Sequence, residues 1–227
     1  MYANLTDKEK VIAEYWADGP ASELPPGHWC LFGQWISNRD NYNLDQDVQM
    51  FFLIGNAVMD SGIASWEAKQ FYDTSRPITA FRYYLKDQQV RSWVGGTTLA
   101  FQTTTGQNWL PYQPDTFITP PFPEYVSGHS TFSSASAEVL KRFTGSDAFG
   151  WYASFGTGYS KIEVASPKSV VTLGWASFTE AANEAGLSRI YGGIHFESGN
   201  LEGQKLGRKI GESVWNKAQT FFNGTAT

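Results

Sequence analysis

The sequence contains few of the residues on which several classes of protein depend. It has one cysteine, Cys30, among 227 residues, so a disulfide framework within the chain is excluded. Charged residues make up only 17% while aromatic residues reach 16%, a balance that excludes intrinsic disorder. The 17 basic residues against 22 acidic ones give a net charge of −5, which argues against nucleic acid or an anionic membrane as the main partner. The chain has only three histidines, so any catalysis or metal binding by histidine is limited to three positions.

Long apolar runs are also lacking. The longest weakly polar run covers residues 48–59 and is too short to cross a bilayer. The residues after Met1 lack the apolar region of a signal peptide. We therefore expect a soluble globular protein without a membrane span. Its localisation stays open, and it would be secreted or periplasmic if an upstream segment is missing from this chain.

Helical patterns dominate what the sequence does contain. Thr6 followed three residues later by Glu9 predicts a capping box for the first helix. Helices are predicted over 5–18, from about 30 to 72, from 76 onward, over 127–143, over 175–186 and over 199–222. The long one is expected to break at Asn43 or Asp45, and the DSG sequence at 60–62 is a candidate for a second interruption. Small residues on one face of the 127–143 helix predict close packing.

The remaining segments are predicted to be non-helical. Residues 19–29 (GPASELPPGHW) are rich in Pro and Gly, which predicts a loop or turn. Residues 95–125 show no sustained period and predict a long irregular loop, either functional or a poorly packed excursion. Residues 155–164 are predicted as a short hairpin or an irregular segment. No linker or repeat divides the chain, so we expect one all-α domain over 1–227, arranged as a helical bundle.

Two pairs of residues could bind an anion: a pair of basic residues, and an arginine with a histidine. Lys69 and Arg76 are seven residues apart and would share one face of a continuous helix. Arg189 and His195 are six apart, with two glycines between them. Each pair alone has an ordinary explanation: an exposed basic pair, or an Arg that bonds carbonyls at a helix end.

A third group stands where a proline-rich loop runs into a helix. Ser127, Gly128 and His129 would begin that helix, where free backbone N–H groups and a serine hydroxyl make an anion site. Alone, the group is equally explained as a serine cap on a structural helix.

Together the three groups favour an oxyanion. Arginine forks match the oxygens of phosphate or vanadate, and lysine adds a point charge. One imidazole could attack or ligate the central atom while the other handles protons on the opposite side. Zinc-type spacing and a phosphate-binding GK[ST] loop are both lacking in the sequence.

The order of these residues resembles the three-part signature of a known superfamily. The pattern Lys-(six residues)-Arg-Pro, then Ser-Gly-His, then Ser-Arg-(five residues)-His is similar to that of type 2 phosphatidic acid phosphatases and vanadium-dependent haloperoxidases. The flanks PPFPEYVSGHSTF and RIYGGIHFESGNLEGQKLGRKIG look like the soluble haloperoxidase branch, so the resemblance covers nearly the whole chain. It implies a helical bundle of the kind found in that superfamily.

The resemblance also implies roles. His195 would ligate vanadium in a haloperoxidase, or be the phosphorylated nucleophile in a phosphatase. His129 would be the acid–base group at the apical oxygen, and Lys69 would help to activate peroxide. The oxygens of vanadate, or of phosphate in the same site, would be bound by Lys69, Arg76, Ser127, Gly128 and Arg189.

Three further residues receive weaker assignments. Trp66 and Phe122 match aromatic positions that line the halide side in chloroperoxidase-like members, although ordinary core aromatics explain them equally well. His28 lies outside the signature and is predicted to be a structural loop residue.

The sequence departs from the family pattern at two positions. Val126 stands where a Pro usually precedes Ser-Gly-His. Gly199 stands where an Asp, four residues after the second signature His, often orients that imidazole. The possible substitutes are Glu197, Ser198, Asn200 or a backbone carbonyl.

The chain is also shorter than the soluble haloperoxidases it resembles. It corresponds to their site-bearing C-terminal half, so we expect either a missing N-terminal bundle or a homo-oligomer.

Three functions follow. The first is a vanadate-dependent haloperoxidase, an oxidoreductase that uses hydrogen peroxide, a halide and a small organic acceptor. The second is an acid phosphatase that hydrolyses a phosphate ester through a phosphohistidine. The third is a phosphate-binding domain without catalysis.

Overall fold

The computed structural model describes residues 4–19, 22–95 and 101–226, which are mostly helical. The helices are α1 (Asp7–Tyr15), α2 (Leu24–Asp40), α3 (Leu44–Tyr72), α4 (Pro77–Tyr84), α5 (Gly128–Thr144), α6 (Phe178–Tyr191) and α7 (Glu197–Phe222), with a 3₁₀ turn η2 (Gly106–Asn108). The strands are β1 (Gln89–Ser92), β2 (Gln102–Thr105), β3 (Ala148–Phe155) and β4 (Val171–Ser177). The helical-bundle prediction is confirmed.

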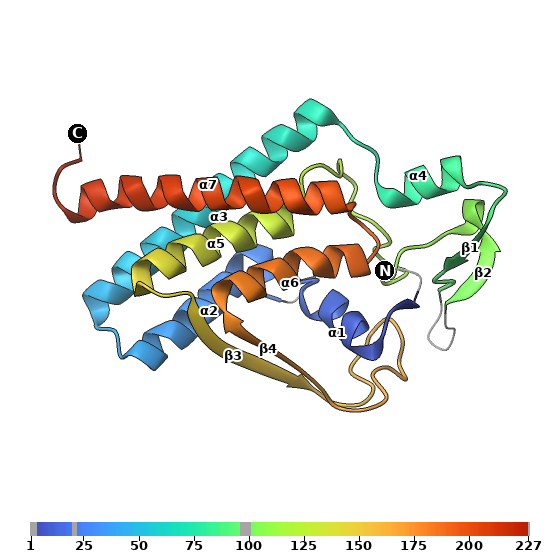
Figure 1. The fold of residues 1–227 in the computed structure, drawn as a ribbon, viewed down its shortest axis with the longest axis horizontal. Coiled ribbons are helices and arrows are strands. Elements are labelled where there is room, and N and C mark those ends of the chain that lie inside the picture. The colour runs from blue at the N-terminus through green and yellow to red at the C-terminus, as the bar shows by residue number, and fades with distance from the viewer. Residues whose placement is uncertain (1–3, 20–21, 96–100, 227) are drawn as a thin grey trace.

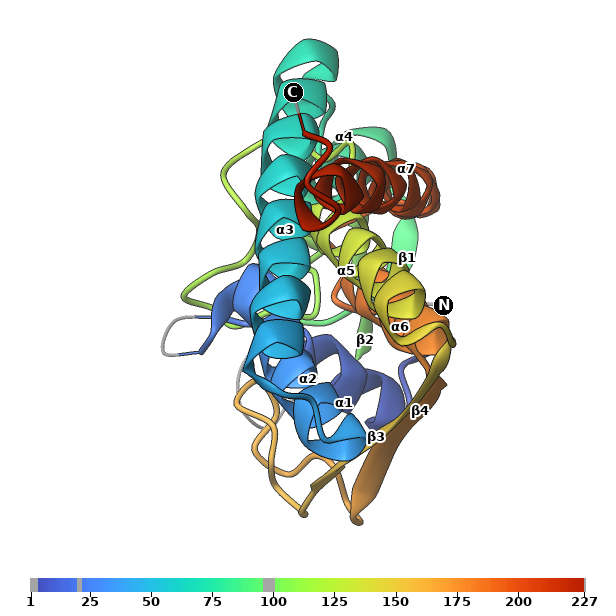
Figure 2. The same cartoon turned by 90° about the vertical axis from the view of Figure 1, so that its left-hand side faces the viewer.

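Helix α5 is the centre of the bundle. It packs against α3, α6 and α7 (Figures 1 and 2). The main core lies around it and between α2, α3 and the β3–β4 hairpin, where Trp29, Phe32, Ile54, Leu140 and Phe178 are among the side chains with almost no exposure. Within the described part of the chain, no helix is long and apolar enough to cross a membrane.

Helices α5 and α7 approach each other backbone to backbone. Glycines recur every fourth residue of α7 on the side that faces α5, at positions 199, 203, 207 and 211. A β-carbon at Gly203 would lie 2.8 Å from the carbonyl oxygen of Ser127, and one at Gly207 would overlap that of Thr131. The small residues predicted on one face of α5 therefore do permit close packing.

Most helix ends lie where the sequence places them. Thr6 and Glu9 form the predicted capping box of α1. Asn43 caps α3, with its side chain accepting from the Gln46 N–H at 3.0 Å. Arg76 and Ser127 are the N-cap residues of α4 and α5. The caps at Thr6, Asn43 and Ser127 follow from local hydrogen bonds, and the start of α4 follows from Pro77 in its first turn, so a short sequence window contains the cause of each.

Two predicted interruptions are wrong. Residues 19–29 are not all loop, because α2 already begins at Leu24: its first turn needs no backbone N–H donors, so Pro25 and Pro26 are tolerated there. The DSG sequence at 60–62 does not break α3. Helix α3 continues through these residues, with Ser61 buried and Gly62 facing the Phe132 ring of α5, from which a β-carbon at Gly62 would be 3.6 Å, an ordinary packing distance.

The β structure was only partly anticipated. Strands β3 and β4 form an antiparallel hairpin that pairs Trp151 with Trp175 and Phe155 with Val171, and residues 155–164 belong largely to its irregular connection. Trp175 is consequently in a strand, and α6 starts three residues later behind its cap Ser177. The predicted irregular segment 95–125 contains β2 and η2, and the part at 96–100 lies outside the described residues.

Candidate functional site

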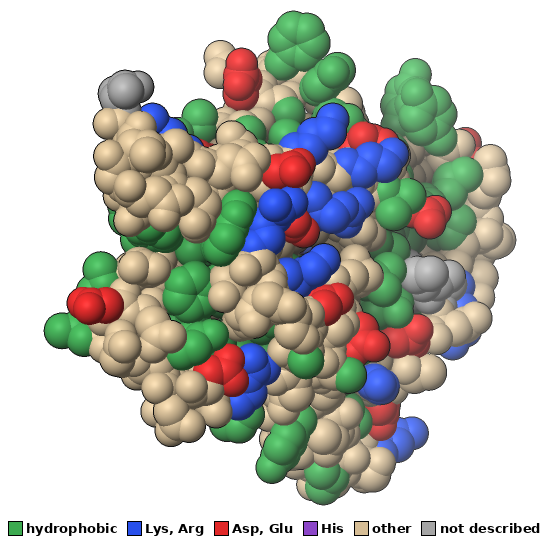
Figure 3. Space-filling model, turned by 60° about the vertical axis from the view of Figure 1, so that its left-hand side comes forward, with side chains coloured by type: hydrophobic (Ala, Val, Ile, Leu, Met, Phe, Trp, Pro, Cys, Tyr) green, Lys and Arg blue, Asp and Glu red, His purple; other side chains and the backbone are tan. Residues whose placement is uncertain are grey.

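The three signature segments meet at one end of the bundle. The start of α5, the end of α6 and the start of α7 come together to the right of centre in Figure 1. Lys69 is in the last turn of α3, and Arg76 caps the start of α4 beside this point. Their side chains are buried, and on the face drawn in Figure 3 no histidine side chain is visible.

Arg76 contacts His195 directly. Arg76 Nη1 lies 3.0 Å from His195 Nε2 and donates to the carbonyl of Ile194 at 2.9 Å. Its Nε donates to the carbonyl of Phe122 at 2.9 Å. The remaining nitrogen, Nη2, is buried without a hydrogen-bond partner in the described structure. The Nη2 group of Arg76 can therefore still donate hydrogen bonds to a ligand.

A carboxylate holds the other side of His195. Its Nδ1 lies 2.6 Å from Oε1 of Glu124, which also accepts from the backbone N–H of Phe196 at 3.1 Å. Glu124 is only 2% exposed. A carboxylate accepts, so Nδ1 carries the hydrogen and Nε2 presents its lone pair toward Arg76.

Burial among cations keeps this imidazole neutral. Desolvation, followed by the charges of Arg76 and Lys69, holds the pKa of His195 well below its usual value. Burial raises the pKa of Glu124, while the Phe196 N–H and the two cations act in the opposite direction. A neutral imidazole with its lone pair on Nε2 is the form that ligates a metal or attacks phosphorus, and here that lone pair accepts from Arg76 Nη1.

The substitute for the usual Asp at position 199 is therefore Glu124. The expected substitutes do not contact the ring: Glu197 and Ser198 are exposed, and Asn200 accepts from Ser130 Oγ at 2.7 Å. Sequence reasoning missed Glu124, although a lone carboxylate in the apolar PPFPEYV loop next to Ser-Gly-His was an available signal.

Lys69 is held by the backbone of the same loop. Its Nζ donates to the carbonyls of Pro123, Glu124 and Val126 at 2.9, 3.0 and 2.6 Å. These three bonds use all three ammonium hydrogens. Burial, followed by the charge of Arg76, lowers the pKa of Lys69 to about 7. In this arrangement Lys69 acts on the site through its charge and fastens the segment that carries Glu124.

Ser127, Gly128 and His129 form the first turn of α5 as predicted. Ser127 Oγ accepts from the Ser130 N–H at 3.3 Å, and its own N–H donates to the carbonyl of Gly199 at 3.0 Å. His129 Nε2 is buried without a partner. Burial and the charge of Arg189 hold the pKa of His129 well below its usual value, against a backbone hydrogen bond with Trp16.

Arg189 lies close enough to influence both imidazoles but is bonded toward α1. Its Nε donates to Ser188 Oγ at 3.0 Å, and its Nη2 donates to the carbonyl of Ala13. Burial lowers its pKa to about 10, so it stays charged. The structure joins Arg76, His195 and Glu124 by direct contacts, whereas Arg189 reaches the group through its charge.

The two aromatic residues assigned to the halide side lie above Lys69. The rings of Trp66 and Phe122 are 5.2 Å apart, and Lys69 Nζ lies 5.8 and 5.3 Å from their centroids. Arg76 also lies over Phe122, at 5.1 Å. Both rings are partly exposed, so they are not ordinary core aromatics. Their role toward a halide stays a prediction.

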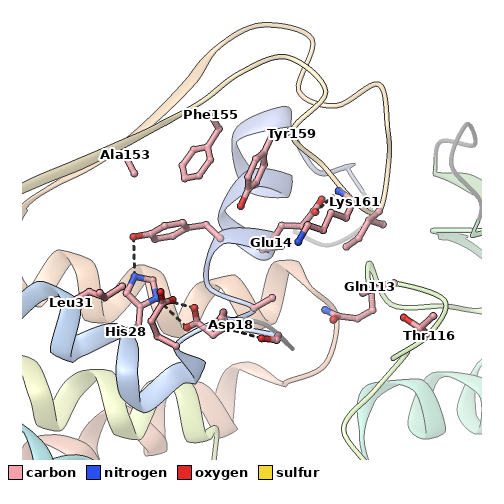
Figure 4. A pocket seen from close by; sticks show the side chains of 18 of the residues that line it. Glu14, Asp18, His28, Leu31, Gln113, Thr116, Ala153, Phe155, Tyr159 and Lys161 are labelled. Atoms are coloured by element: carbon pink, nitrogen blue, oxygen red, sulfur yellow. Dashed lines mark hydrogen bonds and ion pairs between the residues drawn. The ribbon is translucent and has the colours of Figure 1, made fainter.

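His28 is not in a loop, contrary to expectation, but within α2. Its Nδ1 lies 3.0 Å from Asp18 Oδ1 and its Nε2 lies 2.9 Å from the Tyr15 hydroxyl. It borders a separate cavity of about 860 Å³ between α1, α2 and the β3–β4 hairpin (Figure 4). Ala13 lines this cavity too, so the end of α1 separates it from Arg189.

The residues present fit an oxyanion. Arg76 Nη2 and His129 Nε2 are buried polar atoms that still need a partner, and His129 lies in the first turn of α5, where helix N–H groups can bind an anion. Among the described residues, no group of three His, Cys, Asp or Glu side chains could hold a metal cation. Cations around one available imidazole match vanadate or phosphate rather than a bare metal ion.

Comparison with known proteins agrees with this chemistry. The family model described as "VCPO second helical-bundle domain" matches residues 49–224. The chain belongs to the vanadium haloperoxidase family. Within that family, vanadium chloroperoxidase of Curvularia inaequalis is 31% identical over 109 residues, which are 48% of this chain and 16% of that protein.

Solved haloperoxidase structures share the fold. A holo-type bacterial vanadium-dependent chloroperoxidase superposes with a TM-score of 0.81 at 24% identity, over 96% of this chain and 45% of that one. The first bacterial vanadium-dependent iodoperoxidase superposes with a TM-score of 0.67 at 27% identity, over 92% and 43%. The chain thus spans less than half the length of these haloperoxidases.

Proposed function

We propose that this chain is a vanadate-dependent haloperoxidase-like enzyme that oxidises halide with hydrogen peroxide. The observation that carries the proposal is the buried contact of His195 Nε2 with Arg76, beside the unpartnered Nη2 of that guanidinium. A bound oxyanion would take over the guanidinium donors, and the Nε2 lone pair that now accepts from Arg76 would become the ligand. The printed names of the relatives, chloroperoxidase and iodoperoxidase, support the same reaction class.

The residues would divide the work as follows. His195 Nε2 would ligate the vanadium, held in that tautomer by Glu124 on Nδ1. Vanadate, when bound, would supply the Lewis acidity that activates hydrogen peroxide toward a halide. His129 Nε2, neutral and without a partner, would accept and return a proton beside the bound anion. The oxyanion charge would be neutralised by Lys69, Arg76 and Arg189, with Ser127 and Gly128 donating at the helix start.

Acid phosphatase activity is the second candidate, and one observation favours it. A histidine nucleophile needs a carboxylate on its far nitrogen, and the 2.6 Å contact with Glu124 provides one despite Gly199. A binding domain without turnover remains the third candidate.

One experiment separates the three. The protein is prepared without metal and assayed for halogenation with peroxide, halide and added vanadate, and in parallel for hydrolysis of a generic phosphate ester. Halogenation that requires vanadate and disappears in His195→Ala is the expected result. Ester hydrolysis inhibited by vanadate would establish the phosphatase instead. Silence in both assays, with vanadate still bound, would rule out both enzymes.

A further inference from the structure

We propose that Glu124 is the positioning residue for His195. The absence of a side chain at Gly199 leaves the space that the Glu124 carboxylate occupies. The proposal deepens the function above, since it concerns the same imidazole, but its geometry is independent of the reaction. A β-carbon at position 199 would overlap Glu124 Oε1 and lie 2.8 Å from its Cδ. The space beside His195 Nδ1 therefore holds one carboxylate. It can come from residue 124 in the loop or from residue 199 in α7, but the two side chains cannot be there together.

The loop is built to deliver that carboxylate. The Glu124 N–H donates to the carbonyl of Thr74 at 3.0 Å, and its carbonyl accepts from Lys69 at 3.0 Å. Both backbone groups of Glu124 are thus fixed, and its side chain is fixed by His195 and the Phe196 N–H. Because Glu124 is fixed at its backbone and at its carboxylate and is only 2% exposed, we expect its side chain to keep a single conformation.

The consequence for His195 is a fixed tautomer. With Glu124 accepting at Nδ1, the ring hydrogen stays there and Nε2 faces Arg76 as a lone pair. Without that acceptor, only the Arg76 Nη1 donor opposes a hydrogen on Nε2. The ring can then turn and the hydrogen can move to Nε2, so the ligating atom is lost while the cations remain.

Four variants test the exchange: Glu124→Ala, Gly199→Asp, the double variant with both changes, and Glu124→Gln. The tautomer of His195 is read by ¹⁵N NMR of histidine-labelled protein, where only three imidazoles have to be assigned. Vanadate affinity is measured by titration of the metal-free protein. Glu138→Gln, a carboxylate paired with Arg142 on α5, is the matched control and should change neither reading.

Glu124→Ala and Gly199→Asp are each expected to weaken vanadate binding, and the double variant is expected to restore it. Glu124→Ala should shift hydrogen from Nδ1 to Nε2 and weaken vanadate binding by about 10–100-fold, as for other outer partners of a metal-binding His. Gly199→Asp should also weaken binding, because its side chain overlaps Glu124. The double variant should recover the Nδ1–H signal and an affinity within about fivefold of the original, as an Asp on α7 takes the empty place.

The proposal is overturned if Glu124→Ala leaves the Nδ1–H signal intact, or if the double variant is no better than the worse single one. Glu124→Gln keeps the side-chain volume, so it reports even if the Ala variant fails to fold: its loss of affinity should be smaller, and no loss at all would contradict the role. The NMR reading needs neither vanadium nor turnover. A chain that never halogenates but shows the expected tautomer pattern would refute the proposed function and leave the positioning role standing.

Discussion

Two of the three histidines are held in the same way yet serve different ends. His195 has Glu124 on Nδ1 at 2.6 Å, and His28 has Asp18 on Nδ1 at 3.0 Å. The difference lies at the other nitrogen. For His195 it meets the guanidinium of Arg76, and for His28 it meets the hydroxyl of Tyr15.

The surroundings of the two rings differ accordingly. His28 is stacked on Trp16 at 4.6 Å between centroids and meets Phe32 edge-on at 4.8 Å. His195 has cations instead, and both Arg76 and Lys69 act on its pKa. A carboxylate on a buried histidine is thus a general way to fix a ring. What lies beyond Nε2 decides whether the ring can bind an anion.

Removal of the guanidinium should have the largest effect, because Arg76 is the cation in direct contact with His195 Nε2, a contact that His28 lacks. Arg76→Ala is expected to lower kcat/KM for vanadate-dependent halogenation by about 10²–10³, as for loss of one oxyanion donor. Arg142→Ala, which removes a surface arginine, is the control and should stay within about twofold. A loss below about fivefold in Arg76→Ala would mean that the two histidines differ for another reason.

The charge of Lys69 should make anion binding beside His195 depend on pH. Its pKa of about 7 means that the ammonium loses its proton as pH rises through that value. The affinity for sulfate, whose own charge is constant, should therefore begin to fall above about pH 7, by roughly tenfold for the loss of one nearby charge. Titrations from pH 6 to 9 check this.

Two variants bracket the Lys69 effect. Lys69→Arg keeps the charge and should flatten the curve at high affinity, whereas Lys69→Met should flatten it at low affinity. A wild-type curve that stays level to pH 9 would show that the three carbonyl acceptors keep Lys69 charged throughout.

The aromatic cover of the cationic site should have a smaller and more selective effect. Trp66→Ala is expected to change the KM for halide by about two- to fivefold and vanadate affinity by less than twofold, because its cation–π contact with Lys69 and its packing beside Gly128 are weak compared with a charged hydrogen bond. Steady-state kinetics with chloride, bromide and iodide measure it. Phe71→Ala, at a far more exposed ring on the same helix, is the control. An equal response of the two variants would remove Trp66 from the halide side.

The smallest effect on activity is expected at His28. His28→Gln breaks two buried hydrogen bonds and should lower the free energy of unfolding by about 2–4 kcal/mol. Halogenation per folded molecule should stay within about twofold. Urea unfolding and active-site-normalised rates check both. If His28→Gln lost turnover but kept its stability, His28 would have a role in the reaction and the contrast with His195 would be wrong.

The parts of the fold that the sequence predicts are those with a local cause. The caps at Thr6, Asn43 and Ser127 lie within four residues of the groups they bind. The hairpin was predicted at 155–164, which is largely the connection between β3 and β4, because the two strands are half exposed and joined by a long irregular segment. The Ser177–Glu180 capping box was nevertheless a readable signal for the true start of α6.

The candidate site divides in the same manner. The order of the signature residues is visible in the sequence, and so is the vacancy at Gly199. The residue that fills it is not, because Glu124 and His195 are 71 positions apart and meet only through tertiary packing. The hydrogen bonds of Lys69 to three carbonyls were likewise beyond prediction, since they depend on how the loop folds back on α3.

The glycine row of α7 has a consequence for the size of the anion that can bind. Gly199, at its first position, admits a carboxylate, while Gly203 and Gly207 bring the backbone of α7 against that of α5. The distance between the first turn of α5 and the segment that carries His195 is therefore set by contact between main chains, which leaves no room for an added side-chain atom. An alanine at Gly207, two turns from Gly199, would part the helices and enlarge the site. Residues that do not touch the anion would in this way affect which anion fits the site.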